Sequence, residues 1–313
     1  MPLEIFFIIL GFILLIKGAD FLVDGAGGIA KKFNIPEIII GLTIVSIGTS
    51  APELFISVNS VLSGHEDFSI GNVLGSNIAN LLLILGTAAI IRPIYFKSKT
   101  KTIEIPMCLF FTIIFVILCN LGEKVSFIDS IILLILFVFF IIYTIYIGKR
   151  NKENETILQE SKERKGWKNI IYILVGIVGL KFGGDFVVNN AEKLALRFDI
   201  SEKVISLTII AIGTSLPELV TSIISSIKNE ADLAVGNVIG SNIFNMLLVI
   251  GVTGLIRPIS YNIEYNVQMT ILLLATILIT LFPYLDKKDQ MTKSDGLMYI
   301  SMYIIYTVML FVS

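Results

Sequence analysis

The sequence predicts an all-α integral membrane protein of ten transmembrane helices in two inverted five-helix repeats, with broken helices at a polar centre. Three observations lead to this prediction: long apolar runs, few charged residues, and polar motifs that occur twice. Of the 313 residues, 55% are hydrophobic and 16% are charged, and the mean hydropathy is +0.87. A soluble domain carries roughly 25% charged residues. The composition therefore excludes a soluble globular protein.

Charge and cysteine content exclude further classes. The formal net charge is −1, and no basic stripe with interleaved aromatic residues occurs, so we expect no nucleic-acid partner. Cys108 and Cys119 share one apolar run without ligand-type spacing, which predicts small buried side chains rather than a disulfide or a zinc site. The sequence indicates no cofactor and no obligate protein partner, and we expect the chain to lie in a lipid bilayer.

The apolar runs have the length of membrane spans. A helix needs about 20 predominantly apolar residues to cross about 30 Å of hydrocarbon. The predicted spans are Leu3–Ala30, Pro36–Leu62, Phe68–Ile91, Ile105–Leu121, Phe127–Ile147, Asn169–Leu196, Lys203–Ile227, Leu233–Ile256, Val267–Tyr284 and Leu297–Val312. The first lacks a basic start and a small-residue cleavage site, so we expect it to belong to the mature protein and not to a signal peptide.

The two halves of the chain repeat each other. Matching residues are separated by 165 positions, namely Asp20-Phe21 and Asp185-Phe186, Glu53 and Glu218, Asn80 and Asn245, Arg92-Pro93 and Arg257-Pro258. Five spans per half is an odd number, so the second half must enter the membrane from the opposite side, as in the inverted repeats of secondary transporters. The predicted units are a first repeat at 1–147, a linker at 148–168 and a second repeat at 169–313.

Basic residues predict the orientation. Lys and Arg of the loops gather on the side that carries the linker, which runs from Gly148 to Trp167 and is dense in Lys, Arg and Glu. Because cytoplasmic loops carry the excess of Lys and Arg, we expect a multi-pass protein of the cell membrane with a cytoplasmic linker and both termini outside.

Polar motifs interrupt the second and third spans of each half. The first half reads Gly41-Leu-Thr-Ile-Val-Ser-Ile-Gly-Thr-Ser-Ala-Pro-Glu53 and Gly71-Asn-Val-Leu-Gly-Ser-Asn-Ile-Ala-Asn80, and the second reads Ser206-Leu-Thr-Ile-Ile-Ala-Ile-Gly-Thr-Ser-Leu-Pro-Glu218 and Gly236-Asn-Val-Ile-Gly-Ser-Asn-Ile-Phe-Asn245. Pro52 and Pro217 should break their helices, since proline lacks a donor and clashes with the carbonyl one turn earlier. Broken helices occur at membrane depth only in packed protein or beside a wet cavity.

The chemistry of these motifs favours a hard cation. Freed carbonyls, Ser and Thr hydroxyls and carboxylates are oxygen ligands, which suit Na⁺ or Ca²⁺ rather than zinc or copper. A single Ser, Thr or Asn could equally make an interhelical hydrogen bond. Glu53 and Glu218 are more informative, because an ionisable group at mid-membrane is unfavourable by at least roughly 2.5 kcal/mol and marks a functional pathway.

On these motifs the sequence resembles the cation/calcium antiporter superfamily, specifically the prokaryotic members of its sodium/calcium exchanger branch. The resemblance covers the whole chain and implies electrogenic, K⁺-independent exchange of Na⁺ for Ca²⁺ by alternating access. It implies a metal site of Glu53, Glu218, Asn80, Asn245, Thr49, Thr214, Ser50, Ser215, Ser76 and Ser241, with Ser46 and Ala211 contributing backbone carbonyls. It also implies that the first and sixth spans slide across the core as a gate, with the small residues Gly18, Ala19, Gly183 and Gly184 letting them pack closely against that core.

One residue departs from the pattern of some relatives. Asn245 stands where several prokaryotic members and the potassium-dependent exchangers have Asp. Two carboxylates and two amides give the site a formal charge of −2, which one Ca²⁺ would neutralise and three Na⁺ would exceed by one charge. A cycle of this kind would move net charge, worth about 2.3 kcal/mol per 100 mV.

Other functions stay open at this stage. A Ca²⁺/H⁺ antiporter is the main alternative, since glutamates can titrate. An intramembrane protease is a different-class alternative, but the chain has no Gly-x-Ser-Gly, and its one histidine, His65, lies in a short loop where we expect it to be solvated. A channel would also use carbonyls and acidic rings, although an inverted repeat favours alternating access.

Overall fold

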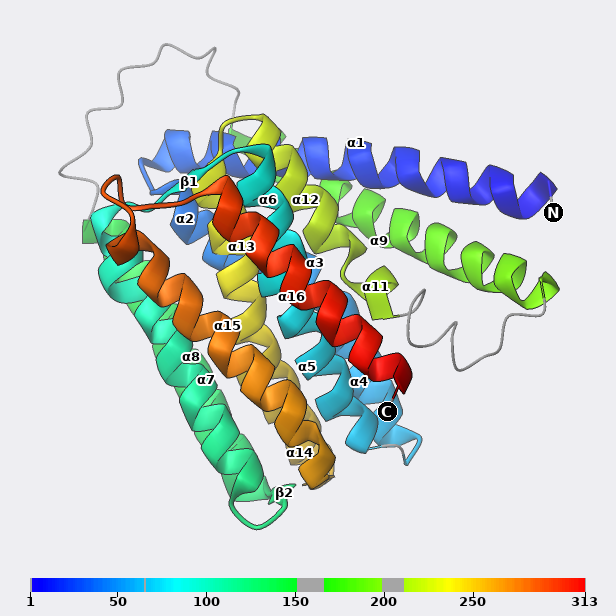
Figure 1. Cartoon of the computed structure of the whole chain (residues 1–313). Coiled ribbons are helices and arrows are strands. Elements are labelled where there is room, and N and C mark those ends of the chain that lie inside the picture. Colours follow the sequence, from blue (N-terminus) through cyan, green and yellow to red (C-terminus); the bar gives the residue numbers. More distant parts are fainter. Residues whose placement is uncertain (1, 65, 151–165, 199–210, 313) are drawn as a thin grey trace.

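The computed structural model describes residues 2–64, 66–150, 166–198 and 211–312. The described chain is almost entirely helical (Figure 1), with two short two-stranded sheets in its loops. His65, most of the predicted linker and the start of the seventh predicted span lie outside the described residues.

The first half begins with one long helix and continues with segmented ones. Its elements are α1 (Pro2–Phe33), α2 (Glu37–Ile40), η1 (Gly41–Val45), α3 (Ser46–Thr49), α4 (Ala51–Leu62), α5 (Asp67–Ile78), η2 (Ala79–Leu85), α6 (Gly86–Ile91), β1 (Ile94–Tyr95), η3 (Thr100–Glu104), α7 (Ile105–Asn120), β2 (Lys124–Val125) and α8 (Phe127–Arg150). The segments η1, η2 and η3 are π-helical and continue directly into the α-helices beside them.

The second half has the same order of long and segmented elements. They are α9 (Gly166–Arg197), α11 (Ala211–Thr214), α12 (Leu216–Ile227), α13 (Ala231–Ile243), η6 (Phe244–Val249), α14 (Ile250–Ile256), β3 (Ile259–Ser260), η7 (Ile263–Tyr265), α15 (Asn266–Leu285), β4 (Gln290–Met291) and α16 (Lys293–Val312). Here η6 is π-helical and η7 is one turn of 3₁₀ helix.

Several of these helices are long and apolar enough to cross a membrane. Seven described helical segments qualify, and the bent pair of Glu37–Thr49 and Ala51–Leu62 makes an eighth. The qualifying segments are Pro2–Phe33, Phe68–Ile91, Thr100–Asn120, Phe127–Ile147, Gly166–Arg197, Ala231–Ile256 and Ile263–Leu285. The predicted seventh span is described only as α11 and α12, and the predicted tenth, α16, falls outside this set.

Burial separates central from peripheral helices. The most apolar window of Ala231–Ile256 is 78% buried and that of Phe68–Ile91 is 72% buried, whereas that of Phe127–Ile147 is 28% buried. The peripheral helix α8 exposes Ile128, Ile135 and Ile142, a stripe at seven-residue spacing that suits contact with lipid. The polar motifs of the sequence therefore belong to the two most enclosed spans and to the interrupted helices beside them, α3 with α4 and α11 with α12.

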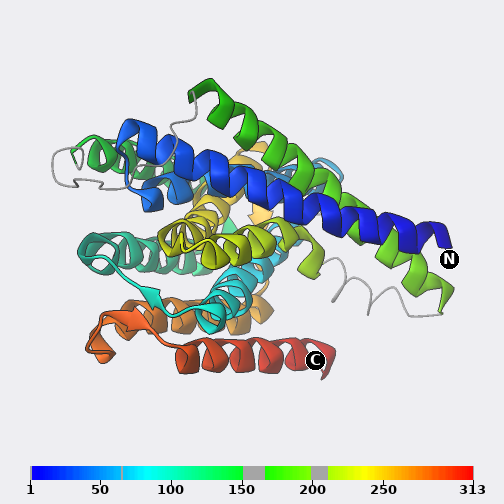
Figure 2. The same cartoon turned by 90° about the horizontal axis from the view of Figure 1, so that it is seen from above.

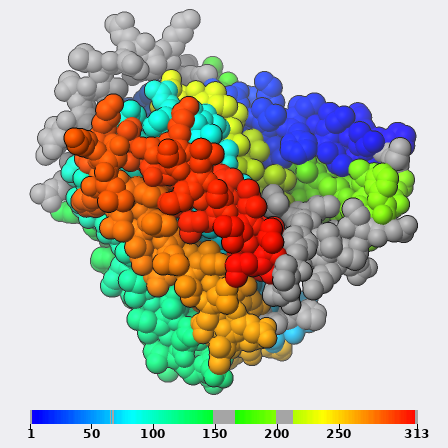
Figure 3. Space-filling model, in the orientation of Figure 1, coloured from blue at the N-terminus to red at the C-terminus, as the bar shows by residue number. Residues whose placement is uncertain are grey.

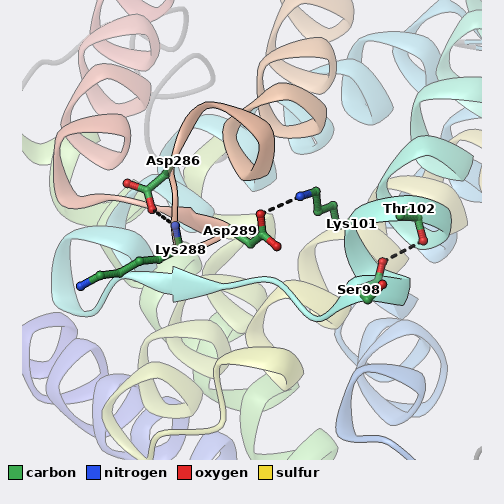
Figure 4. Close-up of polar contacts among 6 residues, drawn as sticks. All are labelled: Ser98, Lys101, Thr102, Asp286, Lys288 and Asp289. Atoms are coloured by element: carbon green, nitrogen blue, oxygen red, sulfur yellow. Dashed lines mark hydrogen bonds and ion pairs between the residues drawn. The ribbon is translucent and has the colours of Figure 1, made fainter.

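The loops pair across the two halves. Strand β1 pairs with β4 and strand β2 pairs with β3, both antiparallel. The backbone bonds match as well, since Phe96 donates to the carbonyl of Asp289 at 2.8 Å and Tyr261 donates to that of Glu123 at 3.0 Å. Glu123 and Asp289 both adopt φ 53°. Beside the pairing of β1 with β4, Lys101 forms a 2.6 Å ion pair with Asp289 (Figure 4).

Helices α1 and α9 pack against each other and lie across the remaining helices (Figures 1 and 2), whereas α15 and α16 cover one face of the molecule (Figure 3). A Cβ atom on Gly18 would lie 2.9 Å from the carbonyl of Gly176, and one on Gly11 would lie 2.8 Å from that of Gly183. The pairing runs antiparallel. For Gly18 and Gly183 the prediction of packing against the core is therefore wrong, because these glycines let the two long helices approach each other. A Cβ atom on Gly184, by contrast, would lie 4.0 Å from Pro217 Cγ of α12.

An ion cluster joins one end of α1 to the loop between α12 and α13. Lys228 Nζ lies 2.5 Å from Asp20 Oδ1 and 2.6 Å from Asp24 Oδ1. Beside it, Glu230 packs so closely on α1 that a Cβ atom on Gly27 would lie 2.9 Å from Glu230 Oε1. Burial is the main factor that raises the pKa of Glu230 to about 7. The charges of Glu37 and Asp24 raise it further, against those of Lys31 and Lys228.

This cluster predicts a pH-dependent stability. Because the pKa of Glu230 lies above its unfolded value of 4.5, its contribution is fully present below pH 4.5 and is lost as the pH rises to about 7. We expect Glu230→Gln, which stays neutral, to stabilise the protein at pH 8 by on the order of 2 kcal/mol and to leave it unchanged at pH 4. Thermal unfolding of the detergent-solubilised protein at both pH values measures this, and an equal effect at both would contradict it.

Candidate cation site

The bent helices of the two halves break at equivalent serines. Ser50 (φ −88°, ψ 5°) separates α3 from α4, and Ser215 (φ −89°, ψ 5°) separates α11 from α12. The first pair of helices bends by 44°. Pro52 and Pro217 lie in the first turn of the helix that follows, where proline removes the donor for the carbonyl one turn earlier. The breaks thus fall where the sequence predicts them.

The neighbouring spans change their helical geometry at the predicted amide ligands. Asn80 lies in the π-helical segment η2 and Asn245 in η6. A π-helical turn inserts a residue into the α-helical ladder and is frequent at functional sites. Both amides are buried, and so both are held inside the protein by segments of irregular backbone.

Two carboxylates occupy the interior. Glu53 and Glu218 each expose 1% of their surface. Ser50 Oγ, from the first half, donates to Glu218 Oε1 in the second half at 3.0 Å. Glu53 Oε2 and Glu218 Oε2 are buried without a hydrogen-bond partner. Buried charges need compensation, so the two free carboxylate oxygens fit a positively charged occupant.

Further oxygens are buried in the same way. Asn80 Oδ1, Asn245 Oδ1, Ser215 Oγ and Ser241 Oγ are buried and lack a hydrogen-bond partner. Unpaired buried acceptors are rare in native proteins, and each calls for an explanation such as a bound ion or water. Together with the carboxylates they form a set of hard oxygen ligands suited to Na⁺ or Ca²⁺.

The other predicted ligands lie in the same segments. Thr49, Ser46 and Ser76 are buried, and Thr214 is half-buried in α11. The hydroxyl of Thr49 donates to the carbonyl of Val45 or to Asn237 Oδ1, both at 3.1 Å. The carbonyl of Ser46 accepts from the backbone N–H of Ser50 at 2.9 Å. Ala211 begins α11, and its side chain lies outside what the structure describes.

Several polar residues beside these ligands are absent from the predicted site. Asn237 accepts from Thr49 and donates to the carbonyl of Glu218 at 3.4 Å and to Ser222 Oγ at 3.1 Å. Its counterpart in the repeat, Asn72, donates to Ser57 Oγ at 3.1 Å. The sequence alone could have indicated both residues, because Asn72 and Asn237 follow the first glycine of each repeated Gly-Asn motif.

Two more asparagines, Asn77 and Asn242, contact the predicted ligands directly. Asn80 Nδ2 donates to Asn242 Oδ1 at 3.0 Å, and Asn245 Nδ2 donates to Asn77 Oδ1 at 3.1 Å. Each bond joins the two halves, and the two bonds are equivalent, because Asn80 corresponds to Asn245 and Asn242 to Asn77 in the repeat. Both asparagines occur in the Gly-Ser-Asn motifs, three residues before the predicted ligand, so one helical face carries both.

Comparison with known proteins yields a consistent assignment. A sequence model of the family described as sodium/calcium exchanger protein matches residues 3–146 and 168–312. The chain is 36% identical to the inner membrane protein YrbG of Escherichia coli, over 87% of each chain. It is 29% identical to the sodium/calcium exchanger MaX1 of Methanosarcina acetivorans, over 97% of each chain.

Solved structures agree. The sodium-calcium exchanger NCX_Mj, soaked with zero Na⁺ and Ca²⁺, is similar with a TM-score of 0.87 and 33% sequence identity, covering 99% of each chain. With the family model spanning nearly the whole sequence, the chain belongs to the sodium/calcium exchanger family.

Proposed function

We propose that this protein is a secondary active antiporter that exchanges Na⁺ for Ca²⁺ across the membrane by alternating access. The observation that carries the proposal is the pair of buried carboxylates, Glu53 and Glu218, each of which has one oxygen without a hydrogen-bond partner. The chain that holds them belongs to the sodium/calcium exchanger family. The relative MaX1 is named as a sodium/calcium exchanger. In this scheme the protein is a transporter and not an enzyme, and both ions are its substrates.

The proposed architecture has ten spans in two inverted halves, 1–147 and 169–313, joined by a cytoplasmic linker at 148–168, with both termini outside. The reciprocal contacts support it. Strand β1 pairs with β4 while β3 pairs with β2, and helix α6 packs on α16 while α14 packs on α8. Such exchange of equivalent partners is expected when a two-fold axis relates the halves. The antiparallel packing of α1 on α9 agrees with opposite orientations of the first span of each half.

Charge explains why two cations would exchange rather than travel together. The site presents two carboxylates, so Ca²⁺ neutralises it and three Na⁺ leave it with one positive charge. Both loads use Glu53 and Glu218, so one must leave before the other binds, which is antiport in physical terms. The net charge moved per cycle would make transport sensitive to voltage, at about 2.3 kcal/mol per elementary charge per 100 mV.

The proposed roles of the residues follow from their contacts. Glu53 and Glu218 neutralise the cation, Asn80 and Asn245 supply neutral amide oxygens, and Ser50 orients Glu218 across the boundary between the halves. The hydroxyls of Ser215 and Ser241 complete the ligand set, with the carbonyls of Ser46, Thr49, Ala211 and Thr214 as further proposed ligands. We assign alternating exposure of the site to movement of α1 and α9 across the other helices.

Exchange is tested by uptake of radiolabelled Ca²⁺ into proteoliposomes. We expect uptake into Na⁺-loaded vesicles and none above background into K⁺-loaded vesicles, because the outward Na⁺ gradient supplies the free energy. A third set of vesicles carries only a pH gradient. Uptake that depends on the pH gradient and not on Na⁺ would overturn the proposal in favour of Ca²⁺/H⁺ antiport, and uptake without any counter-ion would indicate a channel.

The carboxylates are tested by Glu53→Gln and Glu218→Gln. Each removes one charge from the site while keeping its shape, and we expect each to reduce Ca²⁺ uptake at least about 100-fold, since an uncompensated partner changes binding by several kcal/mol. The matched control is Glu264→Gln, which removes an exposed carboxylate. Retained uptake in either site variant, with folding verified by size-exclusion chromatography, would contradict the assignment.

Asn245 is tested by Asn245→Asp. A new carboxylate beside two existing ones should titrate near physiological pH through mutual repulsion, whereas the native amide cannot titrate. We therefore expect uptake by the variant to depend more steeply on pH than that of the parent, or to require a further cation. Identical pH and K⁺ profiles in variant and parent would count against this role of Asn245.

A further inference from the structure

Four asparagines form a closed set of bonds between the two halves. Asn77 Nδ2 donates to the carbonyl of Asn242 at 3.2 Å, and Asn242 Nδ2 donates to the carbonyl of Asn77 at 3.3 Å. Their Oδ1 atoms accept from Asn245 Nδ2 and Asn80 Nδ2 at 3.1 and 3.0 Å. Asn77 and Asn242 are fully buried, and Asn80 and Asn245 are 1% exposed.

This pattern determines which way each amide points. A backbone carbonyl can only accept, so the partner that Asn77 turns toward Asn242 must be its NH₂ group. Asn77 Oδ1 then points to Asn245, and Asn245 must answer with its own NH₂ group. Its Oδ1 is left on the other side, where it is buried without a partner. The same constraints, applied from Asn242, determine the orientation of the Asn80 amide.

The orientation matters because the two ends of an amide have opposite polarity. An amide oxygen is a ligand for a hard cation, whereas an NH₂ group in the same place would repel it. A flipped Asn245 would also set its oxygen against Asn77 Oδ1, with no hydrogen between them. The backbone carbonyl of Asn242 therefore orients the amide of Asn77, which in turn orients Asn245 with its oxygen toward the cation. The carbonyl of Asn77 orients Asn80 in the same way through the amide of Asn242.

We propose that Asn77 and Asn242 are positioning residues for cation binding, which hold the amides of Asn245 and Asn80 with their oxygens toward the cation. The inference rests on the proposed function, since it gives these two amides the role of cation ligands. Neither positioning residue touches the cation in this scheme. Loss of one such residue should weaken the affinity for Ca²⁺ more than it lowers the maximal rate.

A double-mutant cycle tests this role. A carboxylate presents an oxygen whichever way it turns, so Asn245→Asp removes the need for orientation. We expect Asn77→Leu to weaken Ca²⁺ binding about 10-fold or more in the parent. Introduced together with Asn245→Asp it should not weaken binding, because one oxygen of that carboxylate faces Asn77 Oδ1 with no hydrogen between them and the leucine removes this contact. Isothermal titration calorimetry with CaCl₂ on the full-length detergent-solubilised protein measures the affinities. Asn120→Leu, at the exposed end of α7 where the amide donates to the carbonyl of Val116, is the control and should leave the affinity unchanged.

Each outcome has a defined meaning. An equal loss of affinity in both backgrounds, or no loss in either, would overturn the positioning role, because packing alone would not distinguish Asn from Asp at position 245. Melting temperatures without Ca²⁺ verify folding, and the mirrored cycle of Asn242→Leu with Asn80→Asp replaces the first if Asn77→Leu does not fold. A parent protein that binds no Ca²⁺ would instead refute the proposed function, and the present inference with it.

Discussion

A carboxylate enclosed at the centre of a membrane is unfavourable by at least roughly 2.5 kcal/mol, and this chain buries two carboxylates inside its apolar helices. Glu53 and Glu218 each keep one oxygen without a hydrogen-bond partner. Hydrocarbon offers no water to relieve that charge. One requirement explains the helix breaks, amides and hydroxyls around these carboxylates. Together they hold polar groups in the interior and leave two carboxylate oxygens available for a cation.

The two halves share this arrangement, and neither half completes it alone. Ser50 of the first half bonds to Glu218 of the second, and the asparagine network joins Asn80 to Asn242 and Asn245 to Asn77. Every one of these bonds crosses between residues more than 160 positions apart in the sequence. Relative movement of the halves would therefore alter the geometry of the ligands directly.

The sequence predicts the membrane class, the repeat and the helix breaks, because each depends on local features. A run of apolar residues is visible without a structure, and Pro52 and Pro217 interrupt a helix wherever they occur. Glu53 and Glu218 could be singled out because an acidic residue within an apolar run is rare for a physical reason.

Contacts between distant segments could not be derived in this way. The bonds made by Asn77 and Asn242 depend on how α5 meets α13, and the close approach at Gly18 depends on α9, which a composition pattern does not place. The sequence shows that glycine permits close packing but not which helix fills the space, and this accounts for the wrong assignment of Gly18 to the core.

The cluster of Lys228 with Asp20 and Asp24 has no counterpart in the other half. Ser63 and Asn189 stand at the positions that correspond to Lys228 and Asp24, and Asp185 pairs with Lys181 of its own helix at 3.0 Å. Lys228 thus ties α1 to the loop between α12 and α13, whereas near the start of α1 Glu4 forms a 2.6 Å ion pair with Arg197 of α9, the other long helix. If α1 and α9 move as proposed above, this unmatched contact would give the two exposed states of the site different free energies before any ion has bound.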